Sequence, residues 1–301
     1  MLLRCCPGMA RRHTAALLVA AMAAVALVGC SGGAGAPASA PSADRFDAGR
    51  AFADLRAQVA LGPRPAGSAA SRRLAERLRD RLPNGRFATV PGGLRNVVGH
   101  LPGRRRAILV GAHYDTKDLP RFVGANDGAA GVAVVLELAR VLRAGRRACD
   151  REIRFVLFDG EESPRGSTDF LRDGLRGSRA YAKAHARSLA AVIVVDFVGD
   201  RDLSIPREAG SDPRLWAALR RAARGAGAAA AFPPGVVGEV LDDHTPFARA
   251  GVPAIDLIDF EYPHFHRPSD TLDKVSARSL DLVGEALVPM LRGLARQTCR
   301  R

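Results

Sequence analysis

Two neighbouring glutamates, Glu161 and Glu162, stand in the stretch FDGEESP directly after the apolar run REIRFVLF. Neighbouring residues of a strand point to opposite faces of a sheet, so packing alone gives no reason to end a buried strand on such a pair. A metal centre does give one, because one carboxylate can bind the ion while its neighbour takes up and releases protons. The pair therefore predicts metal-assisted acid–base chemistry.

Further histidine and aspartate side chains occupy comparable places in other apolar segments. They are His113 and Asp115 in AILVGAHYDTK, Asp127 in FVGANDG, Asp196 in VIVVDFVG and His266 in EYPHFHRPSDT. Ligands of an open α/β sheet bind beyond the carboxyl ends of its strands, so side chains from separate strand ends can converge on one site. Histidine and carboxylate ligands without cysteine suit a catalytic zinc ion rather than a closed structural one.

Most of these residues also have a structural explanation when each is taken alone. His113 at a strand end is more often hydrogen-bonded than metal-bound, and Asp127 before a helix is more often an N-cap. His264 and His266 could belong to the surface of a loop. Asp196 resists such an explanation, since an unpaired carboxylate in an apolar strand is costly. Their common position at strand ends favours a shared site.

The elements that must position these residues follow from alternating helical and strand patterns. Helices are predicted over residues 43–61, 68–82, 127–145, 177–189, 212–226, 242–251 and 276–297, and strands over 86–90, 94–101, 105–115, 151–160, 190–200 and 252–258. Ser68 suits the N-cap of the second helix. This alternation predicts a single α/β domain with a mixed, mostly parallel central sheet and helices on both faces.

The 301-residue chain carries a formal net charge of +14, almost all of it from arginine. A basic chain can bind nucleic acid or an anionic membrane. Here the arginines are scattered over the predicted helices, no run interleaves them with aromatic residues, and no nucleic-acid-binding motif is present. We therefore expect no nucleic-acid partner and attribute the charge to an arginine-rich background composition.

The first residues predict an export signal. Arg4, Arg11 and Arg12 precede the apolar run AALLVAAMAAVALVG, which is short for a membrane-spanning helix. The run ends in LVGC, and small residues before a cysteine at this place resemble the signal of a bacterial lipoprotein, with Cys30 as the lipidated first residue of the mature chain. An ordinary cleaved signal that contains a cysteine and a true start at Met9 are the alternatives.

Three parts are predicted along the chain, namely a lipoprotein-type signal peptide over residues 1–29, a flexible Gly/Ala/Ser/Pro tether over 30–43 and a zinc-dependent catalytic domain over 44–301. We expect an exported bacterial protein at the cell surface or in the periplasm, whose membrane contact is a lipid anchor at Cys30. Such a compartment permits a disulfide between Cys149 and Cys299, although two buried free thiols fit the sequence equally well.

Six segments together resemble the family of zinc exopeptidases that includes bacterial aminopeptidases and glutaminyl cyclases. They are AHYDT, GANDGAAGVA, DGEES, VVDFVG, LDDHTPFARAGVPAI and FHRPSDT, and their order and spacing make the resemblance specific. It covers nearly the whole folded part, from ALGPRPAGS to the last predicted helix. The resemblance implies the α/β fold predicted above and an enzyme that acts on peptide or protein N-termini.

The resemblance also implies roles for individual residues. Asp127, Glu162 and His266 would bind one zinc ion, and Glu161 would be the general acid/base. Asp115 would orient a histidine of the metal site from behind it. One zinc ion per chain is the expectation for a glutaminyl cyclase, and two for an aminopeptidase.

The two branches of the family differ in how the remaining polar residues act. In a cyclase, Glu161 would carry a proton from the α-amine of an N-terminal glutamine to the leaving ammonia, within a hydrogen-bond network shared with Asp196 and Asp243. The product would be N-terminal pyroglutamate. In an aminopeptidase, His113 and Asp196 would complete a second zinc site, with Asp127 as the bridging ligand.

Several segments favour the cyclase branch. HYDTK is close to the cyclase form HYDSK, FVGANDGAAGVAVVLELARVL is similar to the cyclase helix, SPRGSTDFLRD is an insertion, and Asp242 stands where aminopeptidases tend to have serine. The chain departs from cyclases at Phe265, where they carry tryptophan, and in the length of the loop around Tyr262. Phe265 and Tyr262 are the predicted substrate-binding residues. A catalytically silent surface lipoprotein with this fold is the third alternative.

Overall fold

The computed structural model describes residues 45–296 and residue 299. The predicted signal peptide, the tether and the lipidation site at Cys30 lie outside these residues. None of the helices in the described part has both the length and the apolar character needed to cross a bilayer.

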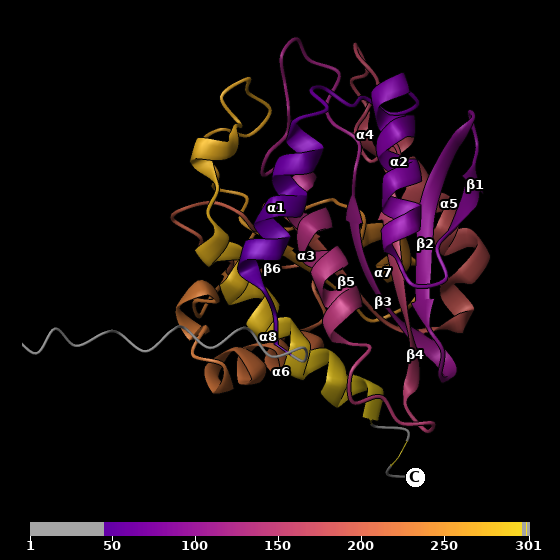
Figure 1. The fold of residues 1–301 in the computed structure, drawn as a ribbon, viewed down its shortest axis with the longest axis vertical. Helices are drawn as coiled ribbons and strands as arrows, with labels where there is room; N and C mark the ends of the chain where they lie inside the picture. Colours follow the sequence, from indigo (N-terminus) through magenta and orange to yellow (C-terminus); the bar gives the residue numbers. More distant parts are fainter. Residues whose placement is uncertain (1–44, 297–298, 300–301) are drawn as a thin grey trace, which may run out of the picture. The chain divides into compact units, whose positions relative to one another are not determined.

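A six-stranded sheet forms the middle of the fold (Figure 1). From one edge to the other its strands are β1 (Arg86–Val90), β2 (Leu94–Leu101), β4 (Arg151–Phe158), β3 (Arg104–His113), β5 (Leu189–Asp196) and β8 (Ala254–Ile258). The pairs β1–β2 and β2–β4 are antiparallel, whereas β4, β3, β5 and β8 run parallel to one another. The predicted mixed, mostly parallel sheet is confirmed.

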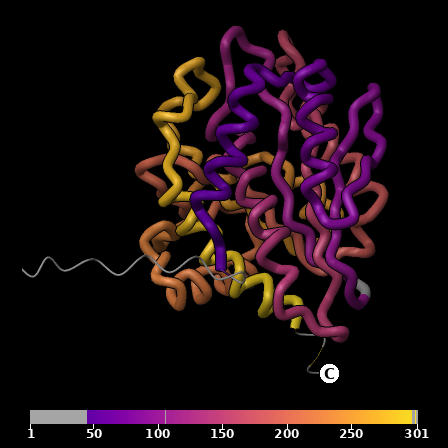
Figure 2. The backbone as a smooth tube through the Cα atoms, in the orientation of Figure 1, coloured from indigo at the N-terminus to yellow at the C-terminus, as the bar shows by residue number. Residues whose placement is uncertain are grey.

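Helices cover both faces of this sheet, as predicted. One face carries α1 (Ala48–Val59), α2 (Ala69–Arg81), α3 (Ala129–Val141), α6 (Pro213–Gly225) and α8 (Ala277–Arg296), and the other carries α5 (Arg176–His185) and α7 (Thr245–Arg249). The first and last of these helices, α1 in indigo and α8 in yellow, lie side by side in Figures 1 and 2 and are in contact. The beginning and the end of the described chain therefore share one core.

The apolar run of β5 shows why the sheet is covered twice. Val192 and Val194 belong to the core beneath α5 and α7, whereas Ile193 and Val195 belong to the core on the opposite face. Successive side chains of a strand alternate between the two faces, so a strand buried on both needs an unbroken apolar sequence. The run AVIVV satisfies this requirement.

Two helix starts bear on the site in different ways. α2 begins as predicted, with the Ser68 hydroxyl accepting a hydrogen bond from the backbone nitrogen of Ser71 at 3.1 Å. α3 begins at Gly128, which has a φ of 89°, and no side chain caps it. A Cβ atom on Gly128 would lie 3.0 Å from the ring of His113, so this close approach needs glycine. Asp127 is consequently no N-cap, and its carboxylate is available for another purpose.

The order of the strands creates a switch point at β3. The chain leaves β3 through α3 and returns as its neighbour β4 on one side, then continues through α5 and returns as β5 on the other side of β3. These two connections cover opposite faces of the sheet. The carboxyl end of β3 therefore faces a crevice, which is where open α/β sheets bind ligands.

Some features of the fold were left open by the sequence or were not predicted. Of the two alternatives for Cys149 and Cys299, the structure has the disulfide, with Cα atoms 5.1 Å apart, and it ties the segment before β4 to the residue beyond α8. The helix α4 (Phe170–Asp173) and the two-stranded sheet of β6 (Arg207–Glu208) and β7 (Val236–Val237) are also additional. These elements are too short to produce a recognisable periodicity.

Candidate active site

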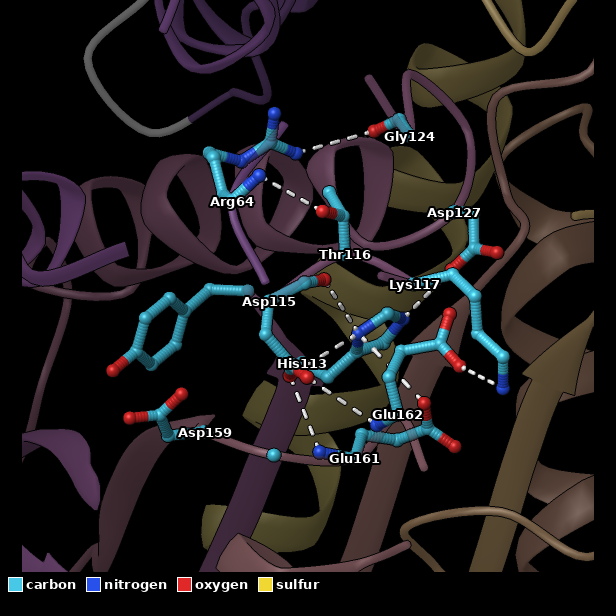
Figure 3. A network of polar contacts seen from close by, with 12 residues as sticks. Arg64, His113, Asp115, Thr116, Lys117, Gly124, Asp127, Asp159, Glu161 and Glu162 are labelled. Atoms are coloured by element: carbon cyan, nitrogen blue, oxygen red, sulfur yellow. Dashed lines mark hydrogen bonds and ion pairs between the residues drawn. The ribbon is translucent and has the colours of Figure 1, made fainter. Parts of the chain in front are cut away.

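The carboxyl ends of β3, β4 and β5 meet at the switch point, and most predicted site residues gather there. His113 is the last residue of β3, and Asp196 is the last residue of β5. Glu161 and Glu162 follow β4, and Figure 3 shows their side chains beside the imidazole of His113. Residues from separate strands thus surround one point, as the sequence predicted.

The turn after β4 lets both glutamates face the same side. Gly160 has a φ of 73°, and a Cβ atom there would lie 2.7 Å from a methyl of Leu94 and 2.8 Å from Nε of Arg176. Only glycine fits, and its left-handed conformation ends the strand before the pair begins. The side chains of Glu161 and Glu162 therefore do not alternate between the two faces of the sheet, and both line one cavity.

The carboxylate of Asp115 holds the backbone of the glutamate pair. Its Oδ1 accepts from the backbone nitrogen of Glu161 at 3.2 Å, and its Oδ2 accepts from that of Glu162 at 3.3 Å (Figure 3). The backbone oxygen of Asp115 lies 3.1 Å from Nδ1 of His113, whereas its Oδ1 lies 3.7 Å away. Asp115 therefore orients the His113 ring through its backbone carbonyl, which leaves Nε2 with a free lone pair.

The first set of possible metal ligands consists of Asp127, Glu162 and His266. Nε2 of His266 lies 3.1 Å from Oε1 of Glu162 and 3.5 Å from Oδ2 of Asp127. The two carboxylates are buried, whereas the His266 side chain is 29% exposed. His266 has a φ of 50°, a backbone conformation that is unfavourable for a non-glycine residue. Such a conformation persists only where the surrounding structure holds it, so the same contacts fix the direction of the His266 ring.

A second set shares Asp127 and adds His113 and Asp196. Nε2 of His113 lies 3.3 Å from Oδ1 of Asp127 and 3.4 Å from Oδ1 of Asp196. All three residues are buried. The two oxygens of Asp127 thus face different histidines, as a carboxylate that bridges two ions would.

The donor atoms fit zinc. Two nitrogen or oxygen ligands on one tetrahedral zinc ion, each at about 2.1 Å, lie about 3.4 Å apart, and the separations in both sets are close to this value. Nε2 of His113 and Oδ2 of Asp127 are buried without a hydrogen-bond partner in the described part of the chain. Since buried polar groups are normally paired, an ion held by each ligand set would supply the partner of the atom in that set.

The electrostatics of the cluster also indicate a cation. Burial raises the pKa of Asp127 to about 7, with the charge of Glu162 adding to the shift. Burial and the same glutamate raise the pKa of Glu161 well above its ordinary value. Burial opposes a charge on His113, but the carboxylates around it, Asp196 above all, outweigh burial and raise the pKa of the ring. The common cause is surplus buried negative charge, which a bound cation would neutralise.

Lys117 is a site residue that sequence reasoning missed. Its Nζ lies 3.0 Å from Oε2 of Glu162, and its side chain lines the cavity (Figure 3). Burial opposes ionisation of Glu162, but the hydrogen bond from His266 and the charges of His266 and Lys117 lower its pKa overall. The lysine belongs to the HYDTK segment that follows a predicted strand, and this position was the sequence feature that could have identified it as a site residue.

The cavity has a volume of about 340 Å³ and contrasting walls. Carboxylates of Glu161, Asp196 and Asp242 line it together with the residues of the first ligand set. Apolar walls come from side chains of four segments, namely Phe170, Phe197, Val240, Leu241, Ile258, Phe260 and Phe265. The cavity therefore suits a ligand with a polar end at the ligand set and an apolar remainder.

Two predicted residues are placed differently from expectation. Asp242 lines the cavity, whereas its neighbour Asp243 does not, and Asp243 is fully buried. Tyr262 is also buried away from the cavity, because its hydroxyl donates to Oδ1 of Asp270 at 2.8 Å. Phe265 does line the cavity, and its ring stacks on that of His266 with centroids 3.9 Å apart.

Asp270 and Arg64 hold the loops of the site, and sequence reasoning missed both. Asp270 accepts hydrogen bonds from the backbone nitrogens of Asn126 and Asp127 at 2.9 and 3.0 Å. The guanidinium of Arg64 is fully buried and donates to the backbone oxygen of Val123 at 2.9 Å. Asp270 follows the late histidine in FHRPSDT, which was the only sequence signal for it.

Known proteins are similar to this chain over most of the described part. Residues 96–291, more than half of the chain, match Peptidase family M28. The crystal structure of an Acidobacteriales bacterium glutaminyl cyclase superimposes with a TM-score of 0.73 and is 32% identical, covering 87% of this chain and 99% of that one.

Curated relatives include both branches of the family. The mouse glutaminyl-peptide cyclotransferase-like protein is 32% identical over 209 residues, which are 58% of this chain and 54% of the relative. Aminopeptidase YwaD of Bacillus subtilis is 28% identical over 193 residues, 59% of this chain and 39% of the relative. The chain thus spans about half the length, or less, of these two relatives.

Proposed function

Because the chain belongs to peptidase family M28, we propose that it is a zinc-dependent glutaminyl-peptide cyclotransferase, which converts N-terminal glutamine of peptides to pyroglutamate and releases ammonia. The similarity to a bacterial glutaminyl cyclase along 99% of that enzyme supports this choice within the family. One observation carries the proposal. The carboxylates of Glu161, Asp196 and Asp242 line the same largely apolar cavity as the first set of possible metal ligands.

Cyclisation suits such a cavity because the reaction needs no water. The α-amine of the substrate attacks the carbonyl carbon of its own γ-carboxamide. A carbon–nitrogen bond forms there, and the bond between that carbonyl carbon and the amide nitrogen breaks to release ammonia. One proton must move from the attacking nitrogen to the departing one. Apolar walls such as Phe197, Ile258 and Phe265 exclude bulk water and so suppress hydrolysis of the same amide.

Glu161 is the residue proposed to move this proton. Its backbone is fixed by Asp115, and its side chain lines the cavity next to the ligand Glu162. Glu161 would accept a proton from the attacking α-amine nitrogen and deliver it to the leaving nitrogen. Asp196 lines the same cavity and would share a hydrogen-bond network with Glu161. Asp242 lines the cavity as well, whereas Asp243 does not, so we assign to Asp242 the place in this network that was expected for Asp243.

One zinc ion at Asp127, Glu162 and His266 is proposed for the cyclase. When bound, zinc acts as a Lewis acid that polarises the γ-amide carbonyl. Lys117 holds Glu162 in place through its ion pair, and the Phe265 ring packs against His266. These contacts orient the ligands before substrate arrives, so that little reorganisation accompanies the reaction.

A two-metal aminopeptidase is the second candidate, and one observation favours it. His113 and Asp196 face the second oxygen of Asp127 at the spacing of metal ligands. A second ion there would activate a water for hydrolysis of the first peptide bond. The similarity to an aminopeptidase supports this candidate at lower identity and coverage.

The cellular setting belongs to the same proposal. An export signal with a lipid anchor at Cys30 would place the enzyme outside the cytoplasm of a bacterium, where it meets peptide and protein N-termini. The disulfide between Cys149 and Cys299 supports an oxidising compartment. Residues 1–29, 30–43 and 44–301 keep their proposed roles as signal peptide, tether and catalytic domain.

Mass spectrometry of a peptide that begins with glutamine tests the proposal. The zinc-loaded protein should reduce the mass of the peptide by one ammonia and leave the chain otherwise whole, whereas a Glu161→Gln variant corrects for spontaneous cyclisation. Loss of the whole first residue would instead establish the aminopeptidase. An unchanged peptide, with zinc bound, would overturn both and leave the silent lipoprotein.

A further inference from the structure

A second cluster of histidine and carboxylate side chains lies behind the wall of the cavity. It consists of Asp242, His244, Asp256 and Glu208, whose exposed fractions are 3%, 2%, 0% and 0%. Donor atoms of Asp242, His244 and Asp256 lie within 4.8 Å of one another. Of the four residues only Asp242 also lines the cavity, so the cluster is separate from the ligand sets described above.

Three different elements bring the cluster together. Asp256 is the central residue of β8, Glu208 ends β6, and His244 is the residue before α7. Glu208 is fixed through its Oε2, which accepts hydrogen bonds from the backbone nitrogens of Gly210 and Val240 at 2.7 and 3.3 Å. The other oxygen of Glu208 therefore points at the cluster with a fixed direction.

The imidazole of His244 stands between two carboxylates without bonding to either. Its Nδ1 lies 3.6 Å from Oδ2 of Asp256, and its Nε2 lies 3.5 Å from Oε1 of Glu208. Buried atoms without a hydrogen-bond partner in the described part of the chain are Nδ1 of His244, both carboxylate oxygens of Asp256, Oδ2 of Asp242 and Oε1 of Glu208. Such a concentration of unpaired buried groups is costly unless something binds between them.

A single proton pairs these atoms less completely than a metal ion does. One proton on Asp256 can be donated either to Asp242 or to His244, so pairing all three groups would take a second proton on Asp242. One cation between the three would bind Nδ1 of His244 and one oxygen from each aspartate together. We propose that Asp242, His244 and Asp256 form a second, buried binding site for a divalent metal ion of the zinc type.

The geometry and the donor types agree with this assignment. The 3.6 Å between Nδ1 of His244 and Oδ2 of Asp256 is too long for a hydrogen bond but close to the spacing of two ligands on one zinc ion, which is about 3.4 Å. A nitrogen ligand favours zinc or a similar ion over calcium, which prefers oxygen. Glu208 faces the remaining ring nitrogen, as carboxylates do behind metal-bound histidines.

The site goes beyond the proposed function and does not depend on it. All four side chains are buried, and among these described residues only Asp242 reaches the cavity wall, so the cluster is closed to solvent. An ion there would tie the segment before α7 to β8 and fix the Asp242 carboxylate at the cavity. Its effect is thus on the shape of the wall, whichever reaction the cavity serves.

Anomalous scattering at the zinc edge from crystals of the zinc-loaded wild-type protein gives the first test. We expect a peak between His244, Asp256 and Asp242, in addition to any peak at His266. A peak at His266 with none at the buried cluster would overturn the proposal and mean that the cluster shares protons only. This measurement needs no variant and no activity.

Metal counting on variants gives the second test, with zinc as the probe. Asp256→Asn keeps the shape of the side chain but removes its charge, and we expect one zinc ion fewer per chain than in the wild-type protein. The matched control is Asp243→Asn, an equally buried neighbour outside the proposed ligand set, which should keep the wild-type count. Equal zinc content in Asp256→Asn and the wild-type protein would contradict the proposal.

Discussion

The two histidine–carboxylate clusters of this protein have similar donor atoms but different surroundings. At the active site His266 is 29% exposed and its ring borders the cavity, whereas His244 of the buried cluster is 2% exposed. Catalytic zinc sites keep a position open for substrate, and structural sites are closed by protein ligands. The opening of the first cluster to the cavity at His266, rather than the type of its donor atoms, therefore distinguishes it from the buried cluster.

Their places in the fold explain this difference. His113 and Asp196 end parallel strands and Glu162 follows one, so their side chains lie at the crevice beyond the carboxyl ends of the sheet. Asp256 lies in the middle of β8, with the pairing partner β5 on one side and residues of β6 and α7 around its side chain. Asp256 is thus enclosed by neighbouring elements, whereas Glu162 and His266 line the cavity.

Glu161→Gln should give the largest change and affects only the open cluster. The substitution removes the proposed proton carrier but no ligand, so turnover should fall by about 10²- to 10⁴-fold with the zinc content unchanged. Rates with a glutamine-initiated peptide and metal analysis of the same sample measure both effects. Full turnover in this variant would assign the proton transfer to another group.

His266→Ala should remove zinc from the open cluster and leave the buried one loaded. Loss of a direct ligand should weaken zinc binding by more than about 100-fold, since loss of a residue behind a ligand already costs 10- to 100-fold. Titration with a chelator, followed by metal analysis, measures the loss. If His264 were the ligand instead, His264→Ala would lose zinc and His266→Ala would not.

Asp115→Asn and Glu208→Gln should produce smaller losses, each confined to one cluster. Asp115 holds the backbone of the glutamate pair, and Glu208 faces the ring of His244. Each variant should weaken zinc binding at its own cluster by about 10- to 100-fold. Site-resolved occupancies from anomalous scattering distinguish the two, and an effect of Glu208→Gln on the active-site zinc would show that the clusters are coupled.

Phe265→Ala should give the smallest change. The stacked pair of Phe265 and His266 is an aromatic contact worth about 0.5–1.5 kcal/mol, so kcat/KM should fall by about 2- to 10-fold. Phe265→Trp keeps an aromatic ring and should stay near the wild-type value. A loss in the tryptophan variant as large as in the alanine variant would mean that ring stacking is not what this position contributes.

The sequence by itself determined the type of fold and the main members of the open cluster. An apolar run predicts a buried strand, and a histidine or carboxylate at its carboxyl end, as at His113, Glu162 and Asp196, predicts the edge of the sheet at which a ligand binds. The runs needed no tertiary information, because a doubly covered parallel strand must be apolar throughout. The family resemblance rested on the same residues, and the match to family M28 confirmed it.

Only the tertiary structure decided which residue of an irregular segment faces which way. Asp242 and Asp243 are chemically identical neighbours in the predicted helix 242–251. The helix α7 begins only at Thr245 and both lie in the irregular segment before it, so no pattern shows that the first lines the cavity. The same holds for Tyr262, whose hydroxyl turns to Asp270, and for Lys117 beside its glutamate.

The buried cluster was also beyond the reach of the sequence. Its members are separated by up to 48 positions, from Glu208 to Asp256, and each has an ordinary local context. Asp256 stands within VPAIDLI, where a single acidic residue in an apolar strand shows that a partner is needed but not which one. Periodicity describes a residue relative to its own element, whereas a site formed between elements depends on how those elements pack.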